Sequence, residues 1–159
     1  NSINGYDRAR QAGRNDQTNR GWTPMKNLLI VTAVIEAATG LALLGVPSRV
    51  VPILLGGSLD TPAALVVGRV GGAALLSIGL SCWLARDDQQ STAATGLIAA
   101  LLLYNIAAVT VLVYAGIGLA LSGIGLWPAV LLHAALAVWC IACLRNQRSN
   151  SSITERAQQ

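Results

Sequence analysis

Apolar residues dominate four long stretches of the chain, and each stretch carries a strongly polar side chain near its middle. The stretches cover residues 27–45, 62–85, 92–115 and 125–144. A helix of about 20 residues is long enough to cross a hydrocarbon core of about 30 Å. The pattern therefore predicts an all-α polytopic membrane protein, with four transmembrane helices in an antiparallel bundle.

Polar residues flank this predicted membrane domain, which covers residues 27–144. Residues 1–26 and 145–159 are rich in Asn, Gln, Arg and Ser, so we expect polar tails that cannot fold alone. No cleavable signal peptide is predicted, because residues 1–21 are polar. Residues 48–61 hold a short apolar run broken by Pro and Gly, which we expect to lie in the membrane interface.

The distribution of charged residues predicts the orientation of the spans in the membrane. Only 11% of the residues are charged, against about a quarter in a soluble domain. Of the 11 Lys and Arg residues, Arg49 lies in an outer connection, Arg69 lies within a span, and the others lie on the side of the tails. Because basic residues accumulate in cytoplasmic segments, we expect both termini in the cytoplasm of a bacterium and the spans in its inner membrane. The net charge of +4 is then explained by orientation, and no nucleic acid partner is expected.

The polar residues inside the spans are Glu36, Arg69, Asn105 with Tyr104 beside it, and His133. A helix rises 1.5 Å per residue, so the four spans place them roughly 10–15 Å from their outer ends. Ionisable groups at such depths are costly and usually face the interior of a bundle. Because arginine stays protonated, we expect Arg69 to pair with Glu36. Tyr104, Asn105 and His133 would complete the hydrogen bonds.

Two interpretations of this predicted polar centre remain open. It could only lock the bundle into one arrangement, as buried polar groups sometimes do. It could also be a proton or ligand site, which His133 favours because a histidine near a carboxylate can titrate around neutral pH.

Small residues mark the predicted packing faces. Gly68, Gly71 and Gly72 lie together on the second span, and Gly68 and Gly72 have the spacing of a close-approach motif. Ala33 and Ala37 repeat that spacing on the first span. We expect these faces to carry helix contacts, either within the chain or between two copies of it.

The cysteines are Cys82, Cys140 and Cys143, all near the predicted cytoplasmic ends of their helices. Structural disulfides are uncommon in that reducing compartment. Buried thiols also pack as small apolar side chains, which is the favoured interpretation here. The alternative is a redox relay through the Cys140-Ile-Ala-Cys143 pair.

Several short motifs resemble those of small uncharacterised bacterial four-helix integral membrane proteins, loosely similar to the DoxX-like set. The motifs are Glu36-Ala-Ala-Thr-Gly40, Gly68-Arg69-x-Gly71-Gly72, Cys82-Trp83-Leu84-Ala85-Arg86, Tyr104-Asn105 and Trp127-Pro128-Ala129-x-x-x-His133. The resemblance covers about residues 26–144. It implies the fold and a bacterial inner membrane, and it implies no activity, substrate or cofactor.

Sequence motifs for catalysis are not evident. The chain has no nucleotide-binding loop, no H-x-x-x-H pair and no G-x-S-x-G, so we expect no enzyme, metal or cofactor. The favoured hypothesis is an accessory or stabilising subunit packed against a larger membrane complex or another copy of itself. The alternative is a small proton-coupled carrier or quinone-binding protein that uses Glu36, Arg69 and His133.

Overall fold

The computed structural model describes the backbone of residues 3–88 and 91–156, and the described side chains lie within residues 24–149. The elements are α1 (Ile3–Gly45), α2 (Pro47–Leu55), α3 (Pro62–Ala85), α4 (Thr92–Ile117) and α5 (Leu126–Arg156). Four segments are long and apolar enough to cross a membrane, namely Pro24–Gly45, Pro62–Ala85, Thr92–Ile117 and Leu126–Gln147. The predicted all-α architecture with four spans is therefore confirmed.

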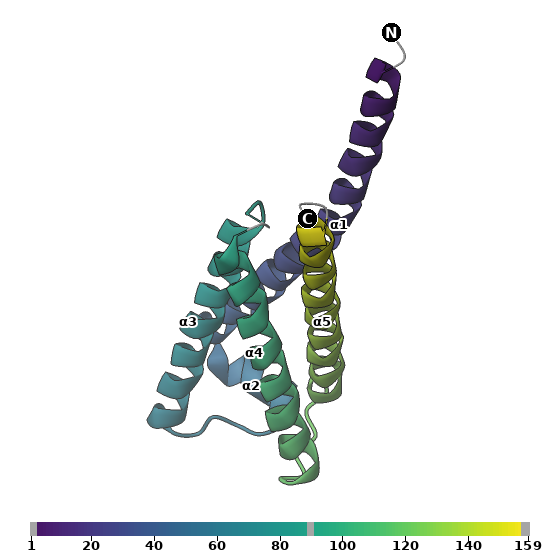
Figure 1. The fold of residues 1–159 in the computed structure, drawn as a ribbon. Helices are drawn as coiled ribbons and strands as arrows, with labels where there is room; N and C mark the ends of the chain where they lie inside the picture. Colours follow the sequence, from purple (N-terminus) through teal and green to yellow (C-terminus); the bar gives the residue numbers. More distant parts are fainter. Residues whose placement is uncertain (1–2, 89–90, 157–159) are drawn as a thin grey trace.

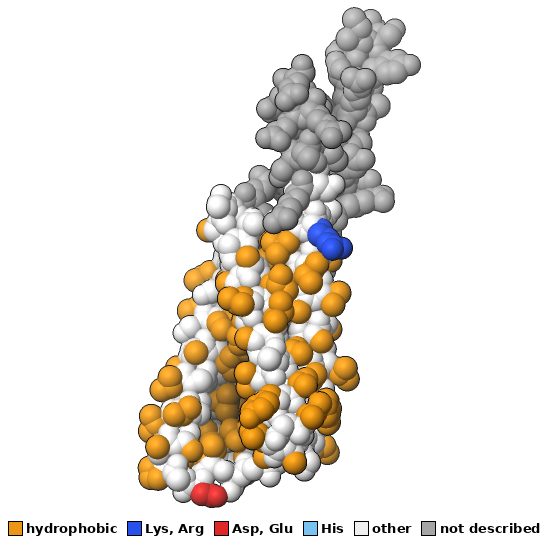
Figure 2. Space-filling view, turned by 60° about the horizontal axis from the view of Figure 1, so that its bottom comes forward, with side chains coloured by type: hydrophobic (Ala, Val, Ile, Leu, Met, Phe, Trp, Pro, Cys, Tyr) orange, Lys and Arg blue, Asp and Glu red, His pale blue; other side chains and the backbone are white. Residues whose placement is uncertain are grey.

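The spans run up and down, so both ends of the chain lie on the same side (Figure 1). We call this side, with Lys26 and Arg86, the tail end, and the opposite side the α2 end. Figure 2 shows hydrophobic side chains along the length of one face, with charged side chains near its two ends. This distribution suits a surface that contacts lipid, because charged groups then stay near the two interfaces.

The helices associate in two closely packed pairs, α1 with α3 and α4 with α5. The short connection after α3 predicts that α3 and α4 are close neighbours, and this expectation is wrong. Contacts between α3 and α4 are few, and the two helices diverge toward the α2 end (Figure 1). Because lipid removes the hydrophobic drive for association, small residues that allow close backbone approach decide the pairing. In α3, these residues face α1.

Glycines form the contact between α1 and α3. A Cβ atom built on Gly72 would lie 2.7 Å from the carbonyl oxygen of Gly40, and one on Gly79 would lie 2.9 Å from the nitrogen of Ala37. Gly68 also faces a neighbour, Pro47. The predicted packing role of Gly71 is wrong, because a Cβ there would meet nothing within 4 Å. In this structure α1 of the same chain covers Gly72, so Gly72 carries a contact within the chain.

Connections at the α2 end are short and well capped. Thr61 caps α3 by accepting a hydrogen bond from the Ala64 amide at 3.2 Å, and Pro62 occupies the favoured first turn. The preceding helix, α2, ends at Leu55 and is followed by its C-cap residue Gly56, whose positive φ of 74° favours glycine. The Gly125 amide donates to the Ile53 carbonyl at 2.9 Å, which ties the start of α5 to α2. The predicted interfacial stretch thus includes a helix of nine residues.

Both tails are helical over the residues that the structure describes, as continuations of the first and last spans. Residues 3–23 continue α1, which is a single helix of 43 residues with Pro24 inside it. Residues 148–156 likewise continue α5. Each tail extends a helix that its span has already nucleated, and adding residues to an existing helix costs far less than starting one.

Candidate functional site

A polar cluster of four residues lies among the spans, formed by Glu36, Tyr104, Asn105 and His133. Glu36 is 2% exposed and Asn105 is 1% exposed, while Tyr104 and His133 are half-buried. Glu36 comes from α1, Tyr104 and Asn105 from α4, and His133 from α5. The cluster therefore links the α1–α3 pair to the α4–α5 pair.

Glu36 has one engaged oxygen and one unpartnered oxygen. The Tyr104 hydroxyl donates a hydrogen bond of 3.2 Å to Oε2 of Glu36. Oε1 of Glu36 is buried and has no hydrogen-bond partner among the described residues. Buried polar atoms are usually satisfied, so an unpartnered carboxylate oxygen is an exception that needs an explanation.

The remaining contacts in the cluster fix the donor and acceptor roles of Asn105 and His133. The side-chain amide nitrogen of Asn105 donates to the Leu101 carbonyl at 2.8 Å. Its Oδ1 atom lies 2.8 Å from Nδ1 of His133. Because that oxygen can only accept, Nδ1 of His133 carries the proton. In the neutral imidazole, Nε2 is then the acceptor.

The Tyr104 and His133 rings connect the two hydrogen-bonded pairs. Their centroids are 5.6 Å apart and their planes meet at 83°, an edge-to-face contact. These contacts connect a carboxyl, a phenol, an imidazole and an amide in that order, from Glu36 through Tyr104 and His133 to Asn105. Such a group can hold a proton, or it can fix the rotation of the three helices that contribute to it, α1, α4 and α5.

Arg69 is the one predicted member of the cluster that the structure places elsewhere. Its side chain is exposed on α3, and among the described residues it makes no hydrogen bond or ion pair. The expected Glu36–Arg69 pair is therefore wrong. The reason is helix rotation: Gly72 faces α1 and Gly68 faces Pro47 of α2. Arg69 follows Gly68 by about 100° around the helix.

Buried residues that sequence reasoning did not single out also surround Glu36 along α1. Thr32 lies one helical turn before it and is 1% exposed. Its spacing of four residues from Glu36 is the signal that could have found it, because such residues share a helix face. The predicted packing role of the cysteines agrees with the structure, since Cys82, Cys140 and Cys143 are buried free thiols in the core. The described residues form no group of three or more potential metal ligands.

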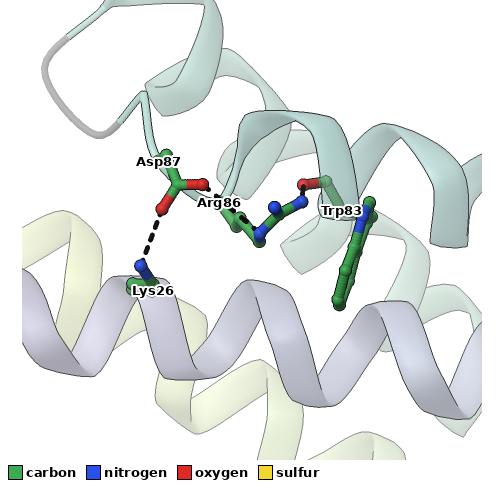
Figure 3. Close-up of polar contacts among 4 residues, drawn as sticks. All are labelled: Lys26, Trp83, Arg86 and Asp87. Atoms are coloured by element: carbon green, nitrogen blue, oxygen red, sulfur yellow. Dashed lines mark hydrogen bonds and ion pairs between the residues drawn. The ribbon is translucent and has the colours of Figure 1, made fainter.

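A second polar group lies at the tail end (Figure 3). The Lys26 Nζ atom is 2.7 Å from Oδ1 of Asp87, and Nε of Arg86 is 3.3 Å from Oδ2 of the same carboxylate. The hydrogen bond from Lys26 is the main cause that holds the pKa of Asp87 below its usual value. The Arg86 guanidinium also lies 4.1 Å from the centre of the Trp83 ring, within cation–π range.

Comparison of the chain with protein-family models, curated proteins and solved structures found no match. The resemblance to DoxX-like proteins gains no support from these comparisons and stays a prediction from the sequence motifs. The four apolar helices identify the chain as an integral membrane protein of the multi-pass type.

Proposed function

We propose that this multi-pass protein is a non-enzymatic subunit that packs against another membrane protein through the flank of α3 that bears Arg69. The support is the exposed position of the Arg69 side chain within an apolar span. Arg69 follows Pro62 by seven residues, which places its Cα about 10 Å along the helix from the α2 end. A charged side chain facing lipid inside a span is costly, by about 3 kcal/mol at the centre of a helix. A partner with acceptor groups at this depth would offset that cost.

The charge on this flank of α3 indicates which kind of partner can bind there. The neighbours of Arg69 on α3 at helical spacing include Val66 and Ala73, which are exposed and carry no charge. A symmetric contact of two copies through this flank would bring two arginines together without an acid between them. The favoured partner is therefore a transmembrane segment with a carboxylate or free carbonyl oxygens in its outer half, and a second copy is a less favourable occupant.

Replacing Arg69 by glutamine is expected to release this partner. The test is purification in mild detergent followed by mass spectrometry of the proteins that co-migrate in stoichiometric amounts. Arg49→Gln is the matched control, because Arg49 is exposed on α2, outside the spans. A photo-crosslinking residue at Val70 should capture the same partner, and one at Val138 of α5 should not. Purification of the wild-type chain alone and monomeric would contradict the proposal.

The unpartnered Oε1 atom of Glu36 favours a second candidate function, a proton-coupled carrier or quinone-binding protein. A buried carboxyl with one unengaged oxygen can take up a proton or accept a hydrogen bond from a ligand. Tyr104 contacts both Glu36 and His133 of this predicted site, while Arg69 lies away from it. One groove lined by described residues, between α1 and α3, includes none of these cluster residues.

Glu36→Gln separates the two candidates. In liposomes with an internal pH dye, a carrier should move protons with its substrate, and the glutamine variant should lose that flux because it cannot exchange a proton. Tyr104→Phe is the matched control, since it removes the hydrogen bond to Glu36 but keeps the carboxyl. If Glu36→Gln leaves both flux and partner binding unchanged, the cluster serves only to lock the helices.

The proposed location is a bacterial inner membrane with both termini in the cytoplasm, supported by the basic residues at the tail end. Cysteines introduced at Ser58, near the α2 end, and at Ser91, at the tail end, test this orientation. In intact cells stripped of their outer membrane, an impermeant thiol reagent should label Ser58→Cys and spare Ser91→Cys. The native cysteines are buried, so they provide a low background. The reverse labelling would invert the topology.

A further inference from the structure

An apolar groove of about 250 Å³ runs between α1 and α3. Ala33, Ala37 and Gly79 form its floor, and Val34, Leu80 and Trp83 form its rim. The rim side chains are exposed, so the groove opens to the surroundings of the bundle. It exists because the floor residues have little or no side chain, while the backbones of α1 and α3 are already in contact at Gly79.

The size of the groove limits what can occupy it. On α3 the lining residues run from Leu76 to Trp83, which corresponds to about 10 Å of helix. A groove of about 250 Å³ over this length is about 5 Å wide and deep. A transmembrane helix is about 10 Å across with its side chains, so it cannot enter. One hydrocarbon chain can.

The groove extends about as far along the helices as one half of the bilayer is thick. At its far limit, Ala37 follows Lys26 by eleven residues and Leu76 precedes Arg86 by ten residues, so the groove ends about 15–17 Å from the tail end. Half of a hydrocarbon core of about 30 Å is also about 15 Å. A lipid tail that starts at the tail end would therefore pass along the groove and end near its far limit.

The polar group at the mouth of the groove suits a phosphate. Lys26 and Arg86 both contact the carboxylate of Asp87 (Figure 3). The side chain of Lys26 is 44% exposed, and an ammonium group has three donors, of which one bonds to Asp87. Trp83 links the two regions, because its ring lines the groove and also contacts the Arg86 guanidinium.

We propose that this groove binds one acyl chain of a phospholipid whose phosphate is held by Lys26, with Arg86 and Trp83 beside it. The site lies at the tail end of the α1–α3 flank, away from the contact proposed for Arg69. Lipid binding in the groove does not depend on the contact proposed for Arg69, so each proposal can be tested without the other.

Native mass spectrometry of the full chain, released from mixed micelles that contain phosphatidylglycerol, tests the site. The wild type should retain one phospholipid. Lys26→Gln should weaken retention about tenfold, as expected when one charge-assisted hydrogen bond is lost. Ala37→Leu should weaken it to a similar degree, because the added side chain fills the floor of the groove. Matched controls are Arg145→Gln, exposed at the tail end of α5, and Ala100→Leu, exposed on α4.

The proposal would be overturned by equal retention in Lys26→Gln and the wild type, by equal loss in the two controls, or by displacement of the bound species by inorganic phosphate alone. The last result would show an anion site without a tail. If Ala37→Leu lowers the thermal midpoint of the fold, Lys26→Gln alone decides the outcome, since Lys26 lies at the mouth of the groove and not within its packing. Retention of a fatty acid but not of phosphatidylglycerol would also contradict the role of Lys26.

Discussion

Replacing Gly72 by valine is expected to destabilise the bundle by about 3 kcal/mol, the upper end of the usual cost of overpacking. A side chain on Gly72 would meet the Gly40 carbonyl oxygen at 2.7 Å and the Leu44 nitrogen at 2.8 Å. Both are backbone atoms, which cannot rotate away as a side chain could. The two helices would have to separate, and the close contacts along their length would be lost with the separation.

Gly71→Val is the control for this effect. Both substitutions add the same side chain at neighbouring positions in α3, so their intrinsic helix propensities cancel. A Cβ atom on Gly71 meets nothing within 4 Å, and we therefore expect little change there. Unfolding in mixed detergent with increasing SDS, followed by circular dichroism, measures the difference. Equal midpoints for the two variants would show that the α1–α3 contact is not as close as described.

Replacing Asn105 by leucine is expected to destabilise the bundle by about 1–2 kcal/mol. The substitution leaves Nδ1 of the half-buried His133 without its acceptor. It also removes the hydrogen bond to the Leu101 carbonyl. Within a membrane the unfolded helices find other polar partners, which keeps the cost below that of an unsatisfied group in a soluble core.

A double-mutant cycle with His133→Leu distinguishes the lost pair from lost packing. Once the histidine is removed, Asn105→Leu should cost clearly less than it does in the wild type, because no partner is left unsatisfied. Thr110→Val is the control on the same helix, because the exposed Thr110 hydroxyl donates its hydrogen bond to the Ile106 carbonyl of that helix. Additive effects of the two substitutions would mean that Asn105 and His133 do not interact.

Sequence patterns predict the spans well because their length is a property of the bilayer. The second predicted span, 62–85, coincides with α3, and the others differ by a few residues at their ends. The helix rise also predicts that Glu36, Asn105 and His133 lie at the same depth in the membrane, and the structure places them in one cluster. These predictions need only the rise of a helix and the thickness of the membrane.

Such patterns do not predict how each helix is rotated about its axis or which helices pair. Gly71 and Gly72 are the same residue type, yet only one of them contacts α1. Arg69 has the depth required to pair with Glu36, but it projects from another side of α3. Both distinctions depend on which face of α3 meets α1, and that choice is made by backbone contacts between residues far apart in the chain.

The pairing of α1 with α3 has a consequence for the order of events during synthesis. Gly40 and Gly72, which lie where the backbones of this pair approach closely, both precede α4, so the ribosome has made them before the second half of the chain exists. We expect residues 1–88 to reach the membrane as a hairpin that already holds together, onto which the α4–α5 hairpin later docks through the polar cluster. A fragment of residues 1–88 that is degraded as soon as it is inserted would argue against this sequence of assembly.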